Sequence, residues 1–158
     1  MPTPACIGFL AALGLAGCAT APVATAPGAE TGLHGGLASK DAIADPLAAR
    51  DIISIYRHNH GLAPLTIDPE LQAAALEKAR AMVLADKASG GVSGIQRGVV
   101  VSNVSAGYHS VADAFSGWRG APQQNANMLN PNVKRMGIAS VYSPHSKYGV
   151  FWALVLTD

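Results

Sequence analysis

Charged side chains are distributed unevenly along this chain of 158 residues, and the asymmetry divides it before any motif is considered. The first charged residue is Glu30, so residues 1–29 carry no charged side chain. Within them, Ile7–Gly17 is an apolar run about as long as the hydrophobic region of a signal peptide. We therefore expect residues 1–17 to be an export signal and the folded part to begin further along the chain.

The run ends in Leu15-Ala16-Gly17-Cys18, where small residues precede a thiol that can be acylated. This resembles the bacterial lipobox, in which the cysteine becomes the first mature residue, although no Lys or Arg precedes the run. An ordinary signal peptide cut elsewhere, or a disordered tail, is the alternative interpretation. Ala19 follows the cysteine, and by resemblance to Gram-negative lipoproteins this implies an outer-membrane anchor facing the periplasm. We expect Cys18 to be lipidated and the membrane to be a partner through that anchor.

Composition separates a tether from a folded part. Residues 18–44 are rich in Ala, Pro, Thr and Gly without a hydrophobic period, which is typical of a flexible linker. Residues 45–158 are long enough to bury a core and form the expected domain. A net charge of +1 with no basic cluster argues against a nucleic-acid partner. The two cysteines, Cys6 and Cys18, both precede the domain, which excludes a disulfide framework for it.

Helix-start signals recur along the folded part. Asp45-Pro46 and Asp68-Pro69 each combine an N-cap residue with proline at the first helical position. Gly61 is expected to end the first of these helices as its C′ residue. Ser110 with Asp113 resembles a capping box and predicts a third helix. Its buried stripe should be Val111, Ala114, Phe115 and Trp118. Pro122 predicts a short fourth helix that runs through Leu129.

Strand signals occur in the second half of the folded part. Residues 99–104 are short and β-branched, and two further strands are predicted at 136–142 and 148–156. The turn-rich segment 143–147 should join the last two into an antiparallel hairpin. Helices mixed with a terminal hairpin predict an α+β fold, with helices packed on the faces of a sheet.

Few residues could carry catalysis. The chain has no His-Glu-x-x-His, Cys-x-x-Cys, Gly-x-Ser-x-Gly or phosphate-loop pattern. His58 and His60 are two residues apart, so on a helix they point in different directions and cannot share a metal. A dense amide cluster, Gln123-Gln124-Asn125-Ala126-Asn127, can donate and accept hydrogen bonds without titrating. Such amides suit recognition of sugars or peptide backbones, and helix capping and turn formation are the equally weighted alternative.

Five segments in order resemble a known family, the bacterial CAP (SCP-like) domains of the cysteine-rich secretory, antigen 5 and pathogenesis-related superfamily. They cover about residues 47–157: Tyr56-Arg57-x-x-x-Gly61-Leu62-x-Pro64-Leu65, Asp68-x-x-Leu71-x-x-x-Ala75, Ser102-Asn103-Val104, Trp118-x-x-x-Pro122-x-Gln124-x-x-Asn127, and the final hairpin. The resemblance implies a three-layer α-β-α sandwich in which helices flank a small, mainly antiparallel sheet.

The departures from the family pattern concern its cleft. Many members line this cleft with His and Glu that can bind a divalent metal, and the matching positions here are Ser102, Gln124 and Ser89 or Gly90. None of these ionises, whereas zinc prefers imidazole, thiolate or carboxylate ligands. The resemblance therefore implies no metal, no other cofactor and no catalytic residue in the cleft. Ser102, Asn103, Gln124 and Asn127 remain as its expected ligand-binding residues.

The leading hypothesis is a non-catalytic, envelope-tethered binding module for a glycan, peptide or lipid of the cell envelope. An envelope hydrolase, directed at peptides or glycans, is the first alternative. It would need His58, His60 or His109 to reach the cleft from positions outside the family pattern. A purely structural or partner-binding lipoprotein is the second alternative.

Overall fold

Two Asp-Pro pairs begin the first two helices of the computed structural model, which describes residues 44–96 and 98–158. Helix α1 is Pro46–His58, and the Asp45 carboxylate accepts the Leu47 amide at 2.9 Å. Helix α2 is Pro69–Ala85, and the Asp68 carboxylate accepts the Glu70 amide at 2.9 Å. Both predicted starts are confirmed. The end of α1 differs, because Asn59 is the C-cap residue and Gly61, at φ +73°, lies in the following turn.

The predicted signal peptide, Cys18 and the tether up to residue 43 lie outside the described residues. Within the described ranges, no helix is long and apolar enough to cross a membrane.

The third and fourth helices follow the predicted capping. Helix α3 is Val111–Gly120, with the Ser110 hydroxyl accepting the Asp113 amide at 3.1 Å and donating to its carboxylate at 2.7 Å. Its predicted stripe is buried, with Val111, Ala114, Phe115 and Trp118 between 0% and 8% exposed. Helix α4 is Pro122–Met128, which ends one residue before the predicted Leu129.

The described residues form a four-stranded sheet in the order β1-β3-β4-β2. Its strands are β1 (Thr66–Ile67), β2 (Val100–Ala106), β3 (Arg135–Tyr142) and β4 (Val150–Thr157). The predicted hairpin is confirmed by antiparallel pairing from Arg135↔Thr157 to Tyr142↔Val150. Strand β2 pairs antiparallel with the other edge of β4, and β1 pairs parallel with the start of β3. Strand β1 was not predicted, because two residues are too short to show an alternating pattern.

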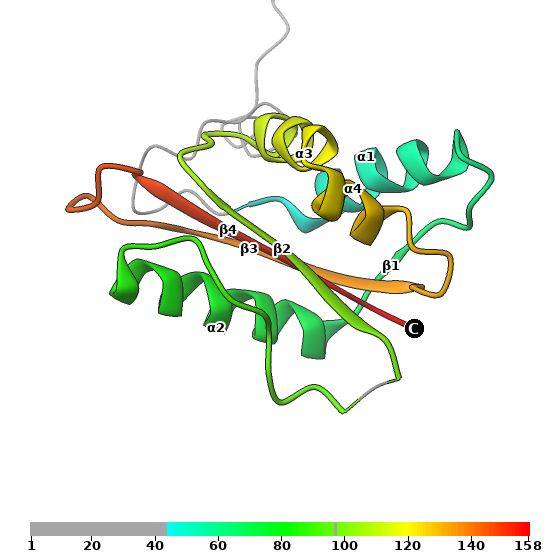
Figure 1. Ribbon diagram of the computed structural model, residues 1–158, viewed down its shortest axis with the longest axis horizontal. Helices are drawn as coiled ribbons and strands as arrows, with labels where there is room; N and C mark the ends of the chain where they lie inside the picture. The colour runs from blue at the N-terminus through cyan, green and yellow to red at the C-terminus, as the bar shows by residue number, and fades with distance from the viewer. Residues whose placement is uncertain (1–43, 97) are drawn as a thin grey trace, which may run out of the picture.

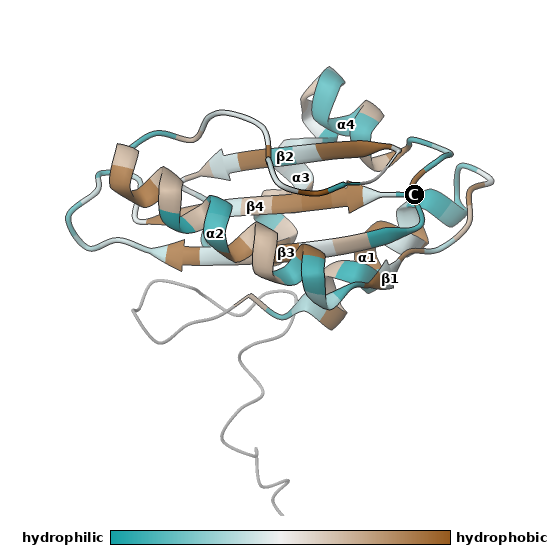
Figure 2. Cartoon of the chain, turned by 90° about the horizontal axis from the view of Figure 1, so that it is seen from below, coloured by the Kyte–Doolittle hydropathy of each residue, from teal (hydrophilic) through white to brown (hydrophobic). Residues whose placement is uncertain are grey.

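The sheet separates two helical layers, as Figure 1 shows. Helix α2 covers one face, where Leu71, Ala75, Ala79 and Met82 pack on β4 residues such as Phe151 and Val155. Helices α1, α3 and α4 lie over the other face, whose core includes Ile53, Trp118, Met128 and Leu154. Figure 2, seen from the side of α2, shows hydrophobic colour along the central strands behind this helix. The predicted α+β class and three-layer α-β-α sandwich are confirmed.

Close packing of α2 on the sheet depends on Gly137 of β3. A Cβ atom there would collide with the backbone of Leu71 at the start of α2. Because backbone on both sides leaves no room to shift, only glycine fits this crossing. The contact fixes the start of α2 against β3.

Candidate functional site

The four predicted cleft residues do come together, where α4 meets the outer edge of β2. The Asn127 side-chain amide donates to the Ser102 carbonyl at 3.1 Å and to Asn103 Oδ1 at 3.0 Å. Asn103 Nδ2 donates to the Gln124 carbonyl at 2.9 Å, and Gln124 Nε2 donates to the Val104 carbonyl at 2.8 Å. Ser102, Gln124 and Asn127 are half-buried, whereas Asn103 is 0% exposed. We call these four residues the amide cluster.

The amide cluster closes an open edge of the sheet. Strand β2 pairs with β4 on one side only, so its other edge would leave backbone groups without strand partners. Gln124 and Asn127 are three residues apart on α4 and therefore face the same way, toward β2. Their amide groups satisfy the Ser102 and Val104 carbonyls that no strand reaches. Much of the hydrogen-bonding capacity of the cluster is thus used within the protein.

At the opposite side of the sheet, a helix side-chain amide again bonds the backbone of a strand edge. Beyond β1, the outer edge of β3 is met by Gln72 of α2, which forms a pair of hydrogen bonds like those of a neighbouring strand. Gln72 Nε2 donates to the Ile138 carbonyl at 2.8 Å, and the Ile138 amide donates to Gln72 Oε1 at 2.6 Å. Side-chain amides from the helices on both faces therefore seal the two edges.

The donor set at the family's metal position does not fit a divalent metal. Gln124 and Ser102 offer neutral oxygens only, and the Gln124 amide nitrogen is engaged with Val104. Residues 44–96 and 98–158 contain no group of three or more His, Cys, Asp or Glu that could hold a metal ion. A zinc ion here would lack both its preferred nitrogen or sulfur ligands and a compensating negative charge.

The described histidines lie away from the amide cluster's hydrogen-bond network. His58 is the exposed last residue of α1, and His60 lies in the following turn with Nδ1 2.8 Å from the Tyr56 carbonyl. His145 is exposed in the β3–β4 turn. His109 lines a separate hollow of about 450 Å³ with Asp113 and Ser116, at the start of α3. The Asp113 carboxylate there accepts the Ser110 hydroxyl.

Arg57 supports α4, a role that the sequence analysis, which named this residue only within a family segment, did not predict. Its side chain is 1% exposed, and its guanidinium donates to four backbone carbonyls. These carbonyls belong to Ala63, Met128, Asn130 and Val133, at 2.7–3.1 Å. Burial lowers the pKa of Arg57 from its ordinary value. The available signal was spacing, since Arg57 continues the buried series Ala49 and Ile53 at intervals of four residues.

Comparison with known proteins supports the family resemblance. The model of the CAP family, described as the cysteine-rich secretory protein family, matches residues 51–156. No curated protein matches the chain. Among solved structures, an extracellular protein containing a SCP domain from Bacillus anthracis is similar at 17% identity and a TM-score of 0.60. That match covers 72% of this chain and 40% of the other.

Two further structures are similar. An outer surface protein from Borrelia burgdorferi matches at 13% identity and a TM-score of 0.60. This match covers 69% of this chain and 88% of the Borrelia protein. A cysteine-rich secretory protein from Staphylococcus aureus matches at 15% identity and a TM-score of 0.51. This match covers 71% of this chain and 37% of the Staphylococcus protein. At these identities the structures show a shared fold, and the chain spans well under half of the Bacillus and Staphylococcus proteins. With the family model matching well over half of its length, the chain belongs to the cysteine-rich secretory protein (CAP) family.

Proposed function

We propose that this protein is a non-catalytic CAP module that is tethered to the cell envelope and binds an envelope ligand. One observation carries the proposal: the positions that carry metal-binding residues in the family pattern hold neutral residues, and the Gln124 side chain at one of them bonds the edge of β2. General acid–base or metal-assisted catalysis needs a titrating group or a metal ligand at the reacting atom. The amide cluster supplies neither, while it keeps α4 and β2 in a fixed relation.

The ligand surface in this proposal is the exposed side of the amide cluster. Ser102, Gln124 and Asn127 are half-buried, so they reach the surface, and buried Asn103 holds them in place from beneath. Uncharged donors and acceptors favour a neutral, hydrogen-bonding ligand such as a glycan or a peptide backbone over a lipid chain.

The binding test uses the full chain carrying Cys18→Ser and envelope material in three forms: insoluble peptidoglycan, peptide-free glycan strands and lipid vesicles. We expect retention by the first or second and none by the vesicles. Gln124→Ala should reduce retention at least tenfold, while Asn132→Ala, an exposed amide in the α4–β3 turn, should leave it unchanged. Equal loss in both variants, or retention by the vesicles alone, contradicts the proposal.

Zinc titration of the same protein separates the module from a metal enzyme. We expect no zinc binding at micromolar concentration that survives the double substitution His58→Ala and His60→Ala. Such binding would place a metal in the described domain and return the hydrolase hypothesis to first place.

Tethering is tested on the unmodified chain. The apolar run that ends at Cys18 supports acylation of its thiol, and three extracellular, surface or secretory proteins share the fold. Cys18→Ser should move the protein from the membrane fraction to the soluble fraction and remove an acyl mass from the mature protein. Membrane retention of the variant without any acyl group would contradict the anchor.

A hydrolase is the alternative with one specific observation behind it, namely the hollow that His109, Asp113 and Ser116 line together. A serine nucleophile needs a neighbouring base that is held by a third group. In the described structure the Asp113 carboxylate accepts the Ser110 hydroxyl at 2.7 Å, so it serves the helix cap. Labelling by a fluorophosphonate that is lost in Ser116→Ala would favour this alternative, and absence of labelling supports the binding module.

A further inference from the structure

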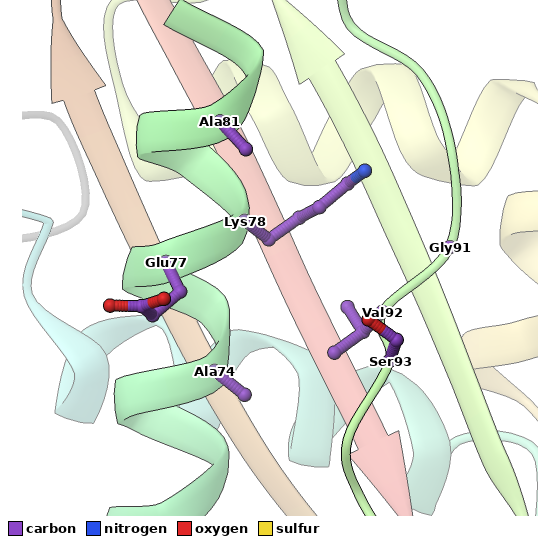
Figure 3. Close-up of a pocket in the computed structure, with 7 residues that line it drawn as sticks. All are labelled: Ala74, Glu77, Lys78, Ala81, Gly91, Val92 and Ser93. Carbon is purple, nitrogen blue, oxygen red and sulfur yellow. The ribbon is translucent and has the colours of Figure 1, made fainter. Parts of the chain in front are cut away.

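Helix α2 and the glycine-rich loop that follows it enclose a second hollow, on the face of the sheet opposite α4. Its volume is about 330 Å³, and Figure 3 shows its lining residues. Ala74, Lys78 and Ala81 come from α2, and Gly91 and Ser93 come from the loop. The amide cluster lies between α4 and β2, whereas Gly90, which the family pattern assigned to the same cleft, lies beside Lys78 at this hollow. The hollow is therefore a separate site, and its test is independent of the proposed function.

The hollow contains the ammonium group of Lys78, which forms no ion pair with another described residue. The Lys78 side chain extends from α2 toward the loop, while the Glu77 carboxylate, which also lines the hollow, points away from Lys78 (Figure 3). The ion pairs of the described residues join Arg50 with Asp51 and Arg135 with Asp68, and none includes Lys78. A half-buried cation that lacks a partner attracts an anion more strongly than an exposed lysine does, because it is less screened by solvent.

Gly90 allows the Lys78 ammonium to lie where it does. A Cβ atom on Gly90 would be 2.9 Å from Lys78 Nζ, and the residue has φ +80°. The φ value favours glycine, since an L side chain rarely adopts it, and a side chain here would also displace the flexible end of Lys78 from its position. Next to it, the backbone of Gly91 has no heavy atom within 4 Å of its Cβ position, so a ligand can approach closely.

The walls restrict the size and polarity of the ligand. Ala74 and Ala81 are small, and Val92 is a partly buried residue that packs against the core beneath α2 and so anchors the loop. These apolar surfaces suit methyl groups, and the single ammonium suits one negative charge. A phosphate dianion would leave one charge uncompensated, and Glu77, which also lines the hollow, repels a dianion more strongly than a monoanion.

We propose that this hollow binds a small carboxylate with an apolar substituent, such as the free C-terminal alanine of a short peptide. The carboxylate accepts hydrogen bonds from Lys78 Nζ, and the alanine methyl lies against Ala74 and Ala81.

The test is a nuclear magnetic resonance titration of the full chain carrying Cys18→Ser, following the backbone amides of Gly91 and Ser93. The probes are N-acetyl-alanyl-alanine, the same peptide with a C-terminal amide, and inorganic phosphate. We expect saturable shifts with the free acid, at least tenfold weaker binding of the amide form, and weaker binding of the acid as salt is raised. Phosphate should bind more weakly than the acid.

Three variants complete the design. Lys78→Gln and Gly90→Ala should each weaken binding of the free acid at least tenfold, whereas Lys134→Gln, at an exposed lysine just before β3, should change it less than twofold. Lys78→Gln should keep the wild-type melting temperature, because this side chain forms no ion pair in the described structure. Equal binding of acid and amide, tighter binding of phosphate, no binding of the acid, or an unaffected Lys78→Gln variant would each overturn the proposal.

Discussion

Replacement of Arg57 by alanine is the perturbation for which the structure gives the clearest expectation. The guanidinium donates to Met128 and Val133 carbonyls in buried positions and to Ala63 and Asn130 carbonyls in partly buried ones. Water can reach the partly buried pair after truncation, so the two buried carbonyls determine the cost. Each buried carbonyl that is left without a hydrogen-bond donor costs about 1–3 kcal/mol, so the two together cost about 2–6 kcal/mol. This is a large share of the ~5–15 kcal/mol that stabilises a typical domain.

Urea unfolding followed by circular dichroism measures this cost directly. Arg57→Ala should lower the free energy of unfolding by about 2–6 kcal/mol and the melting temperature by about 10 °C or more. Arg57→Lys should recover only part of the loss, because an ammonium cannot place donors on four separated carbonyls as a planar guanidinium does. Arg50→Ala is the matched control on the same helix, since Arg50 forms only an exposed pair with its neighbour Asp51.

The control should change the free energy of unfolding by less than about 1 kcal/mol. If Arg57→Ala is as stable as Arg50→Ala, the four carbonyls do not depend on Arg57 and the reasoning is refuted. A second readout locates the effect: hydrogen exchange in α4 should accelerate more than exchange in α2, because Arg57 binds the carbonyl at the end of α4.

Three further predictions concern the core, one sheet edge and pH. Trp118→Ala should cost about 3–5 kcal/mol in urea unfolding, because the side chain is 1% exposed within the core between α3 and the sheet, and a cost below 1 kcal/mol would contradict that placement. Gln72→Ala should cost about 1–3 kcal/mol and speed exchange of the Ile138 amide, since both hydrogen bonds to β3 are lost. The Val99 amide and the Thr157 hydroxyl lower the pKa of the Asp158 carboxyl, so its stabilising effect is present above the unfolded-state pKa of about 3.9 and is lost as pH falls through the lower folded-state value. Asp158→Asn should therefore be less stable than the wild type at pH 7 and equally stable near pH 2, and a difference that persists at low pH would contradict this assignment.

Elements with a local chemical signal could be predicted from the sequence. The two Asp-Pro starts, the Ser110–Asp113 cap and the terminal hairpin each depend on residues that are close in the chain. Strand β1 could not be predicted, because its two residues become a strand only through parallel pairing with β3, about seventy residues later. The positions of the amide cluster could be predicted through the family resemblance, but its hydrogen bonds to the edge of β2 could not, since they are made between distant segments.

The amide cluster also explains why neutral residues at the family's metal position are compatible with an intact fold. A neutral histidine at position 124 would carry its donor and its acceptor on one rigid ring, whereas glutamine carries both on a flexible amide that can align with the edge of β2. In this chain the Gln124 amide donates to Val104, while the Gln124 backbone carbonyl accepts from Asn103, so side chain and backbone both join α4 to β2. This amide supplies the sheet with a hydrogen bond that an exposed edge strand otherwise lacks. A neutral residue at this position therefore does not weaken the scaffold, and substitutions at the α2 hollow, on the opposite face of the sheet, should leave the edge of β2 undisturbed.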